Sequence, residues 1–65
     1  MEVEILNKPE FYRIIKEDFD VVVGEIPVHI VAYKSKETGE DIYIHNGKLH
    51  CSENMIAYFR KKDVI

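Results

Sequence analysis

Over most of the stretch from Phe19 to Cys51, every second residue is apolar. A period of two is the pattern of a β-strand that buries one face and exposes the other. Three breaks that are polar or contain glycine, at 24–25, 34–41 and 46–47, divide this stretch into four segments. The pattern therefore predicts a four-stranded antiparallel meander.

The first break, Gly24-Glu25, predicts a two-residue hairpin of type II′, because its first central position needs a positive φ that glycine adopts without strain. This turn sets Phe19 opposite Ile30 on an apolar side of the sheet, which we call the inner face. The longer break is predicted to be an exposed loop, with Gly39 in the left-handed conformation.

The last break, Asn46-Gly47, predicts a type I′ hairpin, in which both turn residues have positive φ. It sets Ile44 opposite Leu49 on the inner face. If the apolar residues of both hairpins share that face, the opposite or outer face carries the other side chains of the strands: Asp20, Val22, Pro27, His29, Val31, Tyr33, Tyr43, His45, Lys48 and His50.

Helical signals flank the meander on both sides. Asn7 is a good N-cap for a helix over 8–17 that has one apolar stripe. Ser52 is a similar N-cap for a second helix, which ends in the basic residues 60–62. Alternation over 2–6 allows one more short strand. We therefore expect a single α+β domain over the whole 65-residue chain: a four- to five-stranded antiparallel meander with two helices packed on one face.

Composition narrows the range of partners and compartments. The net charge of −3, with His neutral, gives no general attraction to phosphate backbones. The one cysteine, Cys51, excludes an internal disulfide and fits a reducing compartment. No apolar run approaches the roughly 20 residues that a membrane-spanning helix needs. Glu2 and Glu4 stand where a signal peptide would be basic. We expect a cytoplasmic protein that does not enter the membrane.

The predicted outer face gathers all three histidines and two of the tyrosines: His29, His45, His50, Tyr33 and Tyr43. One interpretation is a recognition surface, because Tyr and His offer flat and partly polar contact area at low entropic cost. The other interpretation is ordinary cross-strand pairing, since aromatic residues are common on half-exposed sheets. The sequence leaves both open.

Metal chemistry and catalysis are not predicted. A structural zinc site needs four ligands at short paired spacings. His45 and His50 come near each other across the second hairpin, whereas Cys51 points to the inner face. A catalytic cysteine needs a neighbouring base, and His50 points away from Cys51 in a strand. We expect no metal, no cofactor and no enzymatic activity.

The function that we favour from the sequence is that of a small non-enzymatic interaction protein, such as an inhibitor, an antitoxin-like partner or a regulator. It would bind another protein, or a second copy as a homodimer, through the exposed Tyr/His face of the sheet or an open edge strand. The candidate contact residues lie on the predicted outer face: His29, Tyr33, Tyr43, His45, Lys48 and His50.

An alternative is a binder of single-stranded nucleic acid, in which tyrosines stack on bases and basic residues contact phosphates. The residues for that role would be Tyr33, Tyr43, Lys48, Arg60, Lys61 and Lys62. The last three are also explained by the preference for positive charge at the end of a helix. A third interpretation is a subunit or fragment whose exposed face completes a larger enzyme.

Overall fold

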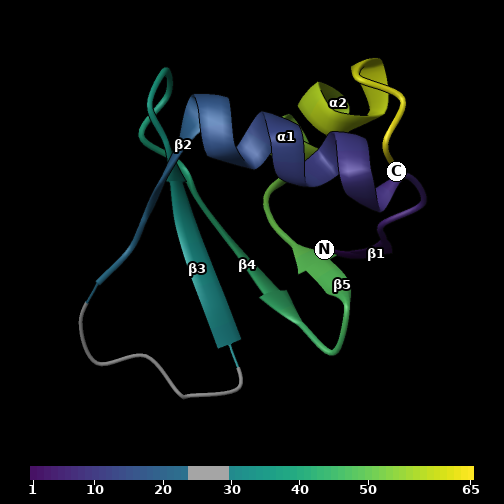
Figure 1. Cartoon of the computed structure of the whole chain (residues 1–65), viewed down its shortest axis with the longest axis horizontal. Coiled ribbons are helices and arrows are strands. Elements are labelled where there is room, and N and C mark those ends of the chain that lie inside the picture. Colours follow the sequence, from purple (N-terminus) through teal and green to yellow (C-terminus); the bar gives the residue numbers. More distant parts are fainter. Residues whose placement is uncertain (24–29) are drawn as a thin grey trace.

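The computed structural model describes residues 1–23 and 30–65, and within them it contains five strands and two helices (Figure 1). In chain order these elements are β1 (Glu2–Glu4), α1 (Lys8–Asp18), β2 (Phe19–Val21), β3 (Ile30–Ser35), β4 (Asp41–His45), β5 (Lys48–His50) and α2 (Glu53–Lys61). The strands form one antiparallel sheet in the order β1-β5-β4-β3-β2. The predicted α+β fold is confirmed, with residues 2–4 as its fifth strand.

Both helices begin at the predicted capping residues. The Asn7 side chain accepts a hydrogen bond from the backbone N–H of Glu10, and the Ser52 hydroxyl accepts one from the N–H of Met55, each at 3.3 Å. These bonds satisfy N–H groups that have no partner within the helix. Within the described ranges, neither helix is long and apolar enough to cross a bilayer.

The core lies between the two helices and the inner face of the sheet. Phe59 of α2 is its aromatic centre, with ring centroids 5.1 Å from Phe11 of α1 and 5.6 Å from Phe19 of β2. The sheet contributes the buried side chains of Ile42, Leu49 and neighbouring residues. Figure 1 shows that the two helices gather over one end of the sheet, and that β3 and β4 extend beyond them.

The turn at Asn46-Gly47 is confirmed in conformation and in register. Both residues have positive φ, 52° and 75°, and Ile44 lies opposite Leu49 as predicted. Gly39 also has the predicted positive φ, 76°.

The predicted register of the first hairpin is wrong. Phe19 lies opposite Ser35 instead of Ile30, and Val21 lies opposite Tyr33. The predicted turn at Gly24-Glu25 lies outside the described residues. The different register is explained by Phe19, which lies where α1 meets β2. Its N–H bonds to a carbonyl of α1, and its ring is buried in the core. The start of β2 is therefore fixed by the helix.

The parity of β3 also differs from the prediction. Ser35 donates its N–H to the Glu40 carbonyl at 2.9 Å, and this closure of the loop over 36–40 puts Tyr33 opposite Ile42. Residues that lie opposite each other point to the same side of a sheet. Tyr33 and Val31 therefore lie on the inner face, and Ile30 and Ala32 lie on the outer face, the reverse of the prediction.

Candidate functional site

The predicted outer-face residues of the second hairpin do come together. Tyr43 and His50 lie opposite each other on β4 and β5, and their rings stack with centroids 4.5 Å apart and an interplanar angle of 5°. The His45 ring lies 6.2 Å from that of His50. Tyr43 is 41% exposed, so one side of this aromatic pair is open to solvent.

Strand β1 adds a charge to this group. Glu2 lies opposite His50, with its carboxylate 3.4 Å from Nζ of Lys48 and 3.5 Å from Nε2 of His50. We call Glu2, Tyr43, His45, Lys48 and His50 the outer-face cluster. Among the described residues, His50 Nε2 is a buried atom without a hydrogen bond, so it lies near the Glu2 carboxylate without being bonded to it. The cluster combines one exposed aromatic ring with internally balanced charge.

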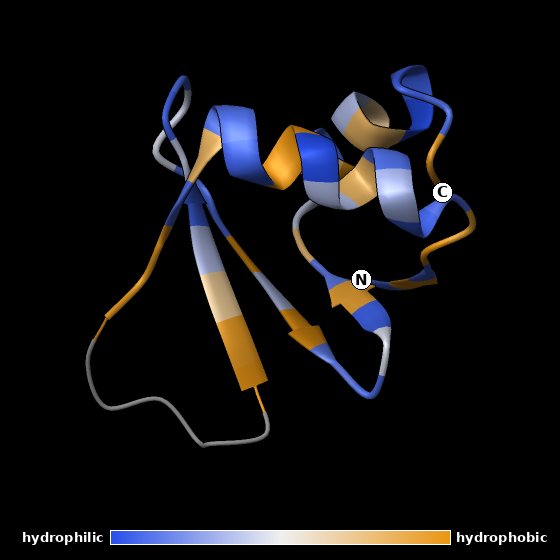
Figure 2. Cartoon of the chain, viewed as in Figure 1, coloured by the Kyte–Doolittle hydropathy of each residue, from blue (hydrophilic) through white to orange (hydrophobic). Residues whose placement is uncertain are grey.

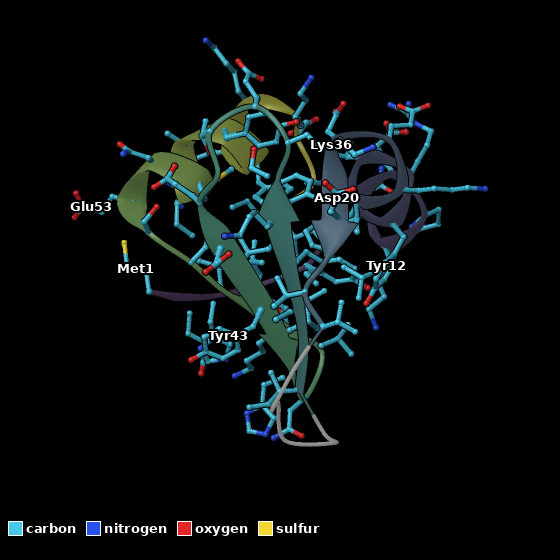
Figure 3. All side chains as sticks on the ribbon, turned by 90° about the vertical axis from the view of Figure 1, so that its left-hand side faces the viewer. Met1, Tyr12, Asp20, Lys36, Tyr43 and Glu53 are labelled. Carbon is cyan, nitrogen blue, oxygen red and sulfur yellow. The ribbon has the colours of Figure 1, made fainter. Side chains whose placement is uncertain are left out.

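One of the predicted contact residues that the structure describes, Tyr33, is not in the cluster. Tyr33 is on the opposite face, where it packs against the core. Burial, and secondarily the neighbouring Tyr12, raise the pKa of its hydroxyl. His29 lies outside the described residues. Figure 3 shows Tyr12 and Tyr43 well apart, on either side of the strands.

The residues of the nucleic-acid alternative are also divided between surfaces. Lys48 is held beside Glu2 on the outer face. Lys62 follows α2, where its Nζ lies 5.5 Å from the centre of the Tyr58 ring. Arg60 and Lys61 are in the last turn of α2, on the helical side of the molecule. Lys48 and the basic end of α2 therefore belong to different sides of the fold.

Sequence reasoning missed an apolar surface on the inner face, beside β2. Val21 is 64% exposed and Val23 is 91% exposed, and Val31 and Tyr12 are exposed as well. Tyr33 lies among them, since it pairs with Val21 and is close enough to Tyr12 for that residue to contribute to the rise in the pKa of Tyr33. We call these five residues the β2-side surface. Figure 2 shows hydrophobic residues at the beginning of β3 and after β2, beyond the reach of the helices.

Strand β2 is also an open edge. Val22 donates its N–H to the Ala32 carbonyl, and Lys36 donates its N–H to the Asp18 carbonyl, each at 3.0 Å. In an antiparallel ladder only alternate residues bond to the same neighbour. The N–H and C=O groups of Val21 therefore point away from β3, and in the described part of the chain β3 is the one strand next to β2.

A groove of about 700 Å³ lies between α2 and the loop that joins β3 to β4. Glu37 and Glu40 stand on the loop side, and Arg60 and Lys61 stand on the helix side, over a partly apolar floor. The Ser52 hydroxyl donates to the Glu40 carboxylate at 3.0 Å, which ties the loop to the start of the helix. No local sequence signal could reveal this groove, because it arises from packing between distant segments.

The surroundings of Cys51 do not activate its thiol. Burial raises the pKa of the half-buried Cys51 thiol, which is opposite to the activation of a nucleophilic cysteine. Within residues 1–23 and 30–65, no three His, Cys, Asp or Glu side chains are grouped so that they could hold a metal ion.

A scan against protein-family models and searches of curated proteins and of solved structures found no significant match to this chain. The functional conclusion therefore rests on the surfaces of the molecule itself. Those surfaces are the outer-face cluster, the β2-side surface with its open edge, and the groove beside α2.

Proposed function

We propose that the protein is a small non-enzymatic interaction protein, of the kind represented by inhibitors, antitoxin-like partners and regulators. It binds another protein, or a second copy of itself, through an exposed part of its sheet. The observation that supports this proposal is the gathering of exposed apolar side chains beside the open edge of β2. Val21 and Val23 are the most exposed of these residues.

The energetic argument concerns what this surface gains on association. Burying a valine side chain that was exposed contributes about 1.5 kcal/mol or more. An edge strand adds backbone hydrogen bonds to any extended segment that aligns with it. Natural sheets usually protect their edges with charged residues, proline or short strands. β2 is short but has valine at its exposed end, so its edge is only partly protected.

The outer-face cluster is the weaker of the two contact regions. Tyr43 offers an exposed ring, but the charges of Lys48 and Glu2 already compensate each other. A partner at this face would have to compete with those contacts. We therefore assign the principal contact to the β2-side surface and treat Tyr43 with His45 and His50 as a second contact region.

The test compares the same type of substitution, from an exposed apolar residue to lysine, at two positions. Val23→Lys adds a charge to the β2-side surface, and Leu6→Lys adds one to a residue that is 71% exposed but lies before α1. Both variants should fold, because neither side chain is in the core. Chemical cross-linking of each purified protein, alone and in a lysate of the native host, measures association with itself and with other proteins.

We expect Val23→Lys to remove the cross-linked species and Leu6→Lys to retain them. Cross-linking that is absent from the unaltered protein, or that both variants change equally, would contradict the proposal.

A further inference from the structure

We propose that the β2-side surface accepts a second copy of this chain, through antiparallel pairing of the two β2 strands about a two-fold axis at Val21. This inference rests on the proposed function and names the partner for the same surface. Pairing of this kind would join the two sheets into one continuous sheet across the axis.

The backbone of β2 determines where the axis lies. The N–H and C=O of Val21 point outward, so two copies of Val21 can exchange a pair of hydrogen bonds. An axis at Phe19 would need the N–H of that residue, which already bonds to the Ile15 carbonyl of α1. The axis at Val21 instead places the outward carbonyl of Phe19 opposite the N–H of Val23 from the second copy.

The side chains around this axis are compatible with self-pairing. On the inner face, Val21 meets its own copy, and Val23 lies opposite Phe19 of the second copy, whose ring is buried in its own core, so neither valine lies opposite a polar side chain. On the outer face, Asp20 lies opposite Val22 of the second copy, so the two carboxylates do not face each other. Each Asp20 also keeps a lysine of its own chain, Lys36, at 3.9 Å (Figure 3).

The other edge of the sheet lacks these properties. β1 carries Glu2 and Glu4 on the outer face, opposite His50 and Lys48 of β5. Two copies of β1 side by side would bring four carboxylates together, and like charges on neighbouring strands are destabilising. Self-pairing is therefore directed to β2.

The experiment is sedimentation equilibrium of the purified full chain over a range of concentrations from micromolar to millimolar. The variant Val21→Pro removes the outward N–H, and proline is tolerated at the non-bonded side of an edge strand. Val23→Lys is a second variant in case Val21→Pro does not fold, and circular dichroism checks both. Leu6→Lys is the matched control for Val23→Lys, because it adds the same charge to an exposed apolar residue outside both contact regions.

We expect the average mass of the unaltered chain to rise from 7.7 kDa towards twice that value with concentration. Val21→Pro should weaken the dimer about tenfold or more. Because of the two-fold symmetry, the substitution removes two hydrogen bonds between the copies at once. Val23→Lys should weaken it as well, and Leu6→Lys should not.

A chain that remains monomeric, a dimer that Val21→Pro leaves unchanged, or a dimer that Leu6→Lys weakens as much as Val23→Lys does would overturn this inference. A different outcome would contradict the proposed function. If the monomeric chain still cross-links to another host protein, and Val23→Lys abolishes that contact, the function holds with a different partner. If no association of either kind occurs, both fail.

Discussion

Asn46 and Gly47 show how much two residues can determine. Their positive φ values close the β4–β5 hairpin, and the closure sets every pair along it, including the stacked Tyr43 and His50. This part of the fold could be predicted from the sequence, because the conformational preference of an Asn-Gly pair is local and strong. The outer-face placement of Tyr43, His45, Lys48 and His50 follows from the same turn.

We expect Gly47→Ala to lower the free energy of unfolding by about 1–2 kcal/mol, the cost of a left-handed conformation in a residue with a Cβ. No atom outside the turn lies within 4 Å of the added Cβ, so the effect should come from the backbone alone. Asn46→Gly is the control and should be nearly neutral. Urea denaturation measures both, and a Gly47→Ala variant as stable as the parent would contradict the turn assignment.

The Cys51 thiol provides a prediction about pH. Burial raises its pKa in the folded state above the ordinary value of 9.0. The stability that this shift contributes is present below the ordinary value and is lost as the pH rises through the folded-state value. At pH near 9 iodoacetamide should therefore modify Cys51 more slowly in the folded chain than in urea. Equal rates, after correction with a model thiol in urea, would mean that the thiol is not buried.

At the scale of elements, the helices and the second hairpin could be predicted, and the pairing of β2 with β3 could not. The caps at Asn7 and Ser52 are local signals. The register of β2 depends instead on Phe19, which ends α1 and joins the core at once. The parity of β3 depends on how its loop closes between Ser35 and Glu40. The local sequence that predicted the first hairpin, a glycine between alternating valines, does not indicate either of these contacts.

The register makes a clear prediction about two isoleucines that the sequence alone places equally in the core. Ile42 is 1% exposed, so Ile42→Ala should cost about 2–5 kcal/mol. Ile30 is only partly buried on the outer face, so Ile30→Ala should cost about 1 kcal/mol. Thermal unfolding of both variants measures the difference. A larger loss of stability from Ile30→Ala than from Ile42→Ala would contradict the observed register. It would support the one in which Phe19 lies opposite Ile30.

At the scale of the molecule, two helices cover only part of a longer sheet. The alternation of residues predicted an apolar inner face correctly but could not show where helical cover ends. Val21 fits the apolar pattern of a core, and Val31 lies on the inner face in the observed register, yet both are exposed, because α1 and α2 lie over the other end of the sheet. The β2-side surface is therefore a property of the tertiary arrangement, and its prediction needed the structure.

The most direct test of the account is amide hydrogen exchange at Val21 and Val22, measured by NMR at several protein concentrations. The Val22 N–H bonds to Ala32 within the chain and should be protected at every concentration. The Val21 N–H faces the open edge, so it should exchange rapidly in dilute protein and slow down as concentration rises. Rapid exchange at Val22 would contradict the register of β2, and an unchanging rate at Val21 would contradict its pairing with a second copy.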